Sequence, residues 1–295
     1  LRREITMERL YKKLFSAIEA DISCAIKNGC ENMCVGSTSF FHNHDGYELT
    51  LILNGQLNIL MDNQSYLLSR GDLILIPPYI FHGSFALLPD EYQRIVISVR
   101  EPVMKELSTN MTDLSVCFFR TPALMANIIH LSEREIIKYC EYANSLHNSL
   151  SSNEFGSDVL SSSLMCQLLV YANRLVSSTA TPKYRNHLSK LMTDTFQYIN
   201  THLTGEISLQ SISEHVHHNA TYVNRLFKKE TGTTLQQYII AKKIALAQKY
   251  LRESYSPCDA CFMSGFNNYS HFSRTFTRQI GQSPRHYQAQ FSSKK

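Results

Sequence analysis

Apolar and polar residues alternate in short runs between about Ser37 and Ser98. The runs YELTLILNGQLNIL, QSYLLSRGDLILIPP and QRIVISV show this pattern, and turn-forming residues separate them at Asn54-Gly55 and Arg70-Gly71-Asp72. A period of two is typical of β-strands that bury one face, and Asn-Gly favours a tight hairpin turn. Closely spaced short strands of this kind predict a small antiparallel barrel or sandwich.

From about Pro102 to Leu175 the apolar positions lie three and four residues apart, which predicts helices. The segment SDVLSSSLMCQLLVYANRLV is the clearest of these. Residues 177–186 are rich in Ser, Thr and Pro and are typical of a linker, and the chain after them is helical in period. We therefore expect an α+β protein of two domains, an N-terminal antiparallel β-barrel with following helices (1–176) and an all-α domain (188–295), joined by a linker at 177–187.

The C-terminal part carries the same pattern twice, 49 residues apart, in NATYVNRLFKKETGTTLQQY and NYSHFSRTFTRQIGQSPRHY. In the first unit, SLQSISEHV predicts a supporting helix, His217-His218 a turn, and Asn219 the N-cap of a second helix. In the second unit, SPCDACFMS is the supporting helix, Gly265 makes the turn and Asn268 caps the next helix. Two short helices with a tight turn between them form a helix-turn-helix, whose second helix enters the major groove.

Between the two units runs TLQQYIIAKKIALAQKYLRES, which predicts a continuous helix. About 20 residues at ~1.5 Å each span roughly 30 Å. Successive major-groove faces of a DNA duplex lie about 34 Å apart. One rigid helix would therefore hold both reading helices on the same side of a duplex.

The charge of the chain is divided between its two parts. The stretch from Tyr184 onward has a net charge of +8, whereas the preceding part has −4. A basic C-terminal third suits nucleic-acid binding. The chain has no apolar run of about 18 residues and no signal peptide, so we expect a cytoplasmic protein that does not bind membranes. The eight cysteines, Cys258 and Cys261 included, are interpreted as small core residues rather than ligands.

The residues from Phe196 to Tyr287 resemble the AraC/XylS family of bacterial transcription regulators. SGFNNYSHFSRTFTRQIGQSPRHY is close to the family signature, in which a Gly-Phe turn precedes the second reading helix. Lys243 departs from the Arg that is usual at its position in the linking helix. The resemblance implies base and phosphate contacts from a set of polar residues on and near the two reading helices. The candidates are Thr221, Asn224, Arg225, Lys228, Lys229, Lys243, Asn268, Tyr269, Ser270, Ser273, Arg274 and Arg278.

The framework repeats but the outward faces differ, since only Arg225 and Arg274 match among the candidate base readers. The two units are therefore expected to read different sequences, which gives each protomer an asymmetric DNA site.

The N-terminal strands hold the pattern His42-x-His44-x3-Glu48-x6-Gly55, followed by Gly71-x5-Pro77 and His82. This resembles the two motifs of the cupin superfamily, with all four metal-ligand positions filled. Three imidazoles and a carboxylate suit Fe, Mn, Ni or Zn, and they equally suit hydrogen bonds to a small molecule. We predict small-molecule contact by His42, His44, Glu48 and His82, while metal binding by these four and a purely structural role stay open. Tyr47 and Arg94 are further ligand-binding candidates.

In this family, helices that follow the barrel commonly support dimerisation. The apolar positions of the segment 120–176 predict either a homodimer seam or packing against the protein's own barrel. The seam residues would be Leu160, Leu164, Leu168 and Leu175.

The resemblance implies a ligand-responsive transcription regulator, an activator, which binds promoter DNA and RNA polymerase and responds to a small molecule, with carbohydrate as the implied class. We predict neither enzyme activity nor a cofactor, because no nucleophile-base pair, phosphate-binding glycine loop or paired carboxylates stand out. Two alternatives stay open. One is a metal-dependent cupin enzyme with a DNA-binding appendage, and the other is a constitutive regulator with a purely structural barrel.

Overall fold

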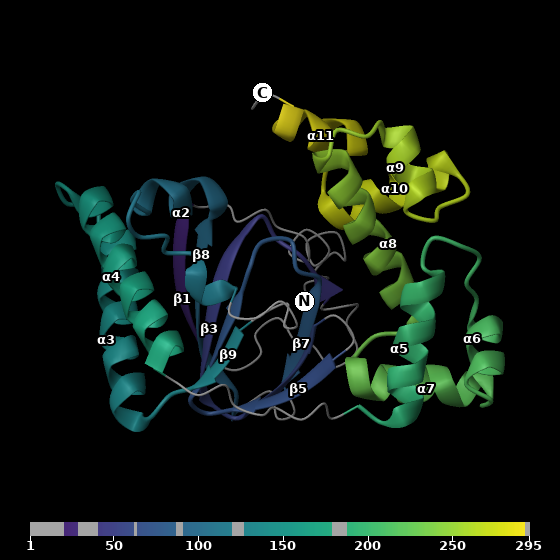
Figure 1. Cartoon of the computed structure of the whole chain (residues 1–295), viewed down its shortest axis with the longest axis horizontal. Helices are drawn as coiled ribbons and strands as arrows, with labels where there is room; N and C mark the ends of the chain where they lie inside the picture. The colour runs from purple at the N-terminus through teal and green to yellow at the C-terminus, as the bar shows by residue number, and fades with distance from the viewer. Residues whose placement is uncertain are drawn as a thin grey trace, which may run out of the picture.

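The computed structural model describes residues 21–28, 41–61, 64–86, 91–119, 127–178 and 188–292. Two sheets form the N-terminal part, with helices α3 and α4 on one side and the helical C-terminal part on the other (Figure 1). The predicted two-part α+β organisation is confirmed. Two of the eight cysteines, Cys30 and Cys34, and residues 179–187 of the predicted linker lie outside the described residues.

The strands form two separate antiparallel ladders, ordered β1-β8-β3-β6-β9 and β2-β7-β4-β5. No ladder of backbone hydrogen bonds joins the two sheets within the described ranges, so the predicted barrel is open. It is a cupin-like sandwich held by side chains. The bounds are β1 Ile22–Asn28, β2 Phe41–His42, β3 Gly46–Asn54, β4 Gln56–Met61, β5 Gln64–Ser69, β6 Asp72–Ile76, β7 His82–Ala86, β8 Gln93–Arg100 and β9 Asn127–His130.

Strand β9 lies in a region where the sequence predicts helix. Its Ile128 and Ile129 pair with Ile74 and Leu73 of β6 and complete the edge of the first sheet. Four residues are too few for a period to show, so the open edge of β6 decides their conformation. Tertiary pairing overrides the local pattern at this point.

Two apolar cores result from the alternation in the strands. Residues on one face of β3 and β6, such as Ile52 and Ile74, pack between the two sheets with Ile59 and Leu68 of the second sheet. The opposite face of the first sheet packs against α3 (Glu133–Leu150) and α4 (Ser157–Ser178). Helix α2 (Glu101–Leu107) and the short 3-10 helix η2 (Val116–Phe118) close the same layer.

The leucines of α4 were predicted either to form a homodimer seam or to pack against the protein's own barrel. Leu168 and Leu175 are buried in the core of their own domain, and Leu164 is partly buried there, so these three do not form a free seam. Leu160 remains exposed. Among the described helices, α4 alone is long and apolar enough to cross a membrane by composition, and its buried face is that of a core helix.

The C-terminal part consists of two helix-turn-helix units joined by α8. The bounds are α5 Lys190–His202, α6 Leu209–His215, α7 Ala220–Thr231, α8 Leu235–Arg252, α9 Pro257–Met263, α10 Tyr269–Ile280 and α11 Pro284–Ser292. The continuous linking helix is confirmed, and Thr234 with Gln237 forms a capping box at its start. Asn219 and Asn268 cap α7 and α10 as predicted, since each side-chain oxygen accepts a backbone N–H of the first turn.

Candidate functional site: a histidine cluster and two reading helices

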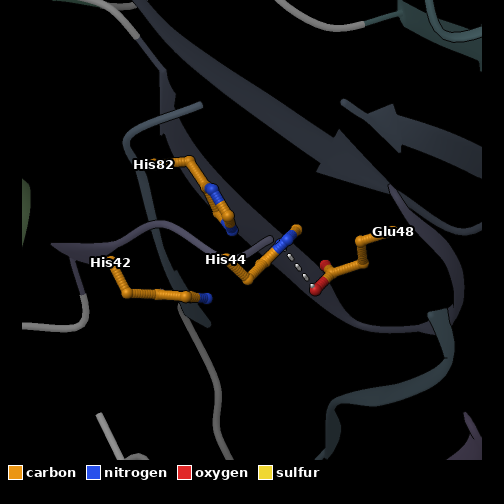
Figure 2. Close-up of side chains that lie close together, drawn as sticks. All are labelled: His42, His44, Glu48 and His82. Atoms are coloured by element: carbon orange, nitrogen blue, oxygen red, sulfur yellow. Dashed lines mark ion pairs between the residues drawn. The ribbon is translucent and has the colours of Figure 1, made fainter. Parts of the chain in front are cut away.

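The side chains of three histidines and a glutamate lie close together in the N-terminal part (Figure 2). His42 on β2 faces His82 at the start of β7, with ring centroids 4.3 Å apart. His44 follows the end of β2, and its ring lies 5.2 Å from that of His82. Glu48 comes from β3. The four ligand atoms lie within 4.8 Å of one another, so the sequence motif does form a single site.

Backbone carbonyls orient two of the imidazoles. The Nδ1 atom of His44 lies 2.7 Å from the Gly46 oxygen, and that of His82 lies 2.9 Å from the Ile80 oxygen. When Nδ1 donates to a carbonyl, Nε2 is the atom directed at the cluster. This arrangement is typical of histidines that bind metals, because the outer hydrogen bond fixes the tautomer and the ring.

Burial and charge shift the pKa values of Glu48, His82 and His44 in different directions. Burial acts to raise the pKa of the Glu48 carboxyl, but its hydrogen bond and charge interaction with His44, with the charges of His82 and His42, hold that pKa well below its usual range. Burial and the charges of His42 and His44 lower the pKa of His82 to about 3. Burial acts to lower the pKa of His44 as well, but the hydrogen bond and charge of Glu48 raise it. Glu48 is therefore ionised and His82 neutral near pH 7.

An ionised Glu48 beside a neutral His82 is also a suitable ligand set for a cation. His44 Nε2 lies 3.4 Å from Glu48 Oε2, and Thr50 donates a 2.9 Å hydrogen bond to Glu48 Oε1. Ligands at about 2.1 Å from an ion lie at most ~4.2 Å from one another. A small inward movement of the four side chains would bring them to that geometry. A metal ion would replace the positive charge that His44 supplies to Glu48.

Tyr47 and Arg94 do not join this cluster. Tyr47 lies on the other face of β3, because neighbouring strand residues alternate, and its ring packs 4.7 Å from Phe118 in the helix-side core. Arg94 does face the space between the sheets, where it pairs with Ile52. It is not next to the cluster, because the residue of β8 that pairs with Glu48 is Ser98, four positions further along the strand. Its guanidinium lies over the Tyr92 ring at 5.1 Å.

The two reading helices present most of the candidate residues outward. The exposed candidates are Thr221, Arg225, Lys228, Lys229, Asn268, Tyr269, Ser270, Arg274 and Arg278, and Asn224 and Ser273 are half-buried. Asn224 also holds the helix that follows, because its side-chain oxygen accepts the Leu235 N–H at 3.1 Å. Exposed Tyr222 was not among the candidates, and Arg225 lies 5.9 Å from its ring. The 49-residue register pairs it with His271, which is also exposed.

Lys243, a predicted DNA contact, makes a hydrogen bond within the protein. Its half-buried Nζ donates a 2.6 Å hydrogen bond to the carbonyl of Gly265, at the turn of the second unit, and burial lowers the pKa of the amine. Gly265 has φ +84°, and a Cβ there would lie 2.7 Å from the Leu203 oxygen after α5. His217 takes the corresponding left-handed position in the first unit, with φ 54°. The two units are thus packed against each other at Gly265.

Cys258 is exposed and Cys261 buried, so one of the two expected core positions is at the surface. Among the described residues, the histidine cluster is the only group of three or more His, Cys, Asp or Glu side chains placed to hold a metal.

Two family models match the chain. One, described as an AraC-like ligand binding domain, matches residues 36–169, and the other, a helix-turn-helix domain, matches residues 212–290. The transcriptional regulator YbfI of Bacillus subtilis is 23% identical over 78% of this chain and 80% of its own length. The transcriptional activator RhaR of Escherichia coli is 25% identical over 82% of this chain and 84% of its own length.

Two solved structures are also similar to this chain. A fatty-acid-bound ToxT from Vibrio cholerae is 13% identical with a TM-score of 0.38, covering 90% of this chain and 94% of that one. The DNA-binding domain of AdpA, in complex with a target DNA, is 23% identical with a TM-score of 0.35, covering 36% of this chain and 97% of that one.

Proposed function

The chain belongs to the AraC family of transcription regulators, and we propose that a small molecule bound at the histidine cluster controls how its two helix-turn-helix units bind promoter DNA. The carrying observation is that four polar side chains meet in the interior of the ligand-binding domain, where His44 and His82 are almost fully buried. Buried polar groups need partners. A ligand that places a polar group among them supplies such partners, and carbohydrates are the first class to test.

DNA binding is tested with the full chain and a labelled fragment from upstream of its own gene. Fluorescence anisotropy at several salt concentrations should show tight binding that weakens steeply with salt, because Lys and Arg side chains displace counterions from the phosphates. A shuffled fragment of equal length is the control. Equal affinity for both fragments would contradict sequence-specific regulation.

Effector binding is tested by thermal shift against a panel of sugars, with His82→Gln as the variant. A sugar that stabilises the wild type but not the variant, and that also changes DNA affinity, identifies the effector class. His130→Gln is the matched control, since His130 lies outside the cluster, against Asp72. If no compound that binds the protein changes its DNA affinity, the barrel is structural and regulation is constitutive.

A second candidate for the same site is a divalent metal ion held by His42, His44, Glu48 and His82. The favouring observation is that both outer imidazole nitrogens already bond to carbonyls while the inner donors converge. When bound, such an ion supplies a positive charge that polarises a ligand oxygen. Metal analysis after exposure to Zn²⁺ should give one ion per chain, and the Glu48→Gln and His82→Gln variants should lose it. Turnover of a substrate by the loaded protein would instead support the enzyme alternative.

The exposed apolar residues of the α3–α4 layer support a homodimer. Ile137 on α3, Phe155 before α4, and Val159 and Leu160 on α4 are all more than half exposed. A second copy of this chain would cover them, and a dimer doubles the phosphate contacts. Light scattering should give a dimer for the wild type and a monomer for Leu160→Glu, while Ser163→Glu on an exposed part of α4 should stay dimeric. We further propose that the protein acts in the cytoplasm and activates transcription through RNA polymerase. The similarity to the activator RhaR supports activation rather than repression.

A further inference from the structure

Two cluster histidines are each preceded in the chain by a phenylalanine whose ring contacts the DNA-binding part of the molecule. Phe41 precedes His42 in β2, and Phe81 precedes His82 at the start of β7. Neighbouring residues of an extended chain point to opposite sides. The histidines therefore face the cluster while the two phenylalanine rings, stacked at 5.5 Å, face away from it.

Both phenylalanine rings contact one residue of α8. Tyr238, near the start of this helix, lies 4.8 Å from Phe41 and 5.8 Å from Phe81 between ring centroids. Tyr238 in turn packs 5.3 Å from Phe227 on the first reading helix, α7. Ring contacts therefore connect Phe41 and Phe81 to the first reading unit, and the backbone of β2 and the start of β7 connects the two phenylalanines to His42 and His82. Phe41 is 2% exposed. Its ring lies so close to Gly83 that a Cβ on this glycine would be 2.7 Å from a ring carbon.

The third histidine is connected to the other end of α8. The N–H of Tyr79 donates a 2.8 Å hydrogen bond to the carbonyl of His44, and Tyr79 has the unusual φ of 66°. The Arg252 guanidinium, at the last residue of α8, lies 3.7 Å from the centroid of the Tyr79 ring. Arg252 also donates a 3.0 Å hydrogen bond to the Tyr287 hydroxyl in the second unit.

The two contacts therefore hold α8 near both of its ends. Tyr238 and Arg252 are fourteen residues apart, or about 21 Å along a helix. Figure 1 shows α8 on the side of the sheets opposite α3 and α4, running between the two units. Helix α8 fixes the position of one reading helix relative to the other. A movement at either end of α8 therefore changes the relative position of α7 and α10.

We infer that Phe41, Phe81 and Tyr79 form a docking surface that transmits the occupancy of the histidine cluster to both ends of α8. This inference rests on the proposed function, because it requires that something binds at the cluster. A ligand that draws the histidines together moves the three aromatic residues joined to them, and the spacing of the two reading helices follows. The coupling is reciprocal, so DNA that selects one spacing changes ligand affinity by the same factor.

The first test uses Zn²⁺ as the probe, with the full chain and the promoter fragment. In the wild type, Zn²⁺ should change DNA affinity by at least about fivefold. Phe81→Leu and Tyr79→Ala should bind Zn²⁺ with unchanged affinity in calorimetry but lose this change. Phe119→Ala, an exposed aromatic of the same domain that contacts Tyr47, is the matched control and should behave as wild type. Docking variants that keep the full Zn²⁺ response would overturn the inference.

The second test needs no ligand and separates this inference from the proposed function. His82→Gln alters the cluster itself, and hydrogen–deuterium exchange should then become faster near both ends of α8 in the full chain. Melting curves establish that the variant is folded, and His130→Gln is the control. Unchanged exchange in α8 of the folded variant would overturn the inference, whereas a wild type that binds no Zn²⁺ would count only against the metal candidate.

Discussion

Lys243 and Gly265 are joined by a 2.6 Å hydrogen bond from the Lys243 Nζ to the Gly265 carbonyl. This bond ties the middle of α8 to the turn of the second helix-turn-helix unit. The same glycine lies against the chain that follows α5 of the first unit. The relative position of the two units thus depends on a residue that the family resemblance had placed among the DNA contacts.

Replacing Lys243 by Met should weaken binding of the full promoter site about tenfold, or ~1.4 kcal/mol, because the turn of the second unit loses its hydrogen bond to α8. The slope of log affinity against log salt should stay unchanged, since no phosphate contact is removed. A direct phosphate contact would instead lower the slope by about one. Lys249→Met, at an exposed residue of the same helix, is the control. Anisotropy titrations over a range of salt distinguish the two roles.

Replacing Gly265 by Ala should destabilise the C-terminal part more than replacing Gly281 by Ala. Both glycines have φ +84°, so both variants incur the same backbone strain, of about 1 kcal/mol. Only at Gly265 does the new Cβ meet backbone atoms, at 2.7 Å from the Leu203 oxygen, whereas at Gly281 it meets nothing within 4 Å. Urea unfolding should give an excess loss of ~1–3 kcal/mol for Gly265→Ala. Equal losses would mean that the two units do not pack as described.

Arg225→Ala and Arg274→Ala should each cost about 1–3 kcal/mol of DNA-binding free energy and relax specificity at different positions of the site. The reason is that the two arginines occupy equivalent positions on helices whose other outward residues differ. Lys228→Ala, in contrast, should weaken binding to all sequences alike. Selection of bound fragments from a random pool measures this. Loss of the same base preference in both arginine variants would contradict two distinct reading helices.

The metal-free protein should lose stability as pH falls below about 6.5, because His82 stays neutral in the folded state, where its pKa is about 3. In that window the unfolded chain binds the extra proton, so stability rises with pH. Glu48, whose pKa is held low, adds a loss in the same direction at more acidic pH. The pKa of His44 is raised in the folded state, so His44 acts in the opposite direction. Its contribution to stability grows as pH falls toward the pKa of the unfolded chain and is constant below it.

His82→Gln should therefore flatten the pH dependence of the melting temperature between about pH 6.5 and pH 4, with a chelator present in both samples. His130→Gln, outside the cluster, controls for the loss of one histidine. Parallel curves for the wild type and His82→Gln would show that His82 is protonated in the folded protein.

Much of the molecule follows from local pattern. The period-two runs gave β3, β4, β5, β6 and β8, and the 49-residue repeat located α7 and α10 with their caps Asn219 and Asn268. These features depend on side-chain spacing within one turn or one strand, which the sequence states directly. The motif residues His42, His44, Glu48 and His82 were also identifiable, because their spacing is that of a known motif.

Other features depend on contacts between residues far apart in the chain. Strand β9 exists because β6 offers an edge, Tyr47 turned to the helix-side core, and the leucines Leu168 and Leu175 were buried by their own domain. The residues around Lys243 in the sequence do not show whether its side chain bonds to the turn at Gly265 or binds a DNA phosphate.

The sequence by itself therefore determined the two kinds of domain, the repeated reading unit and the four residues of the cluster, since each is written in a short stretch of chain. The tertiary structure alone decided that Phe41, Phe81 and Tyr79 lie against α8, and that Lys243 serves the turn at Gly265. An aromatic residue before a histidine has the same pattern whether it lies in a core or against another domain. Only the path of the chain brings it to Tyr238.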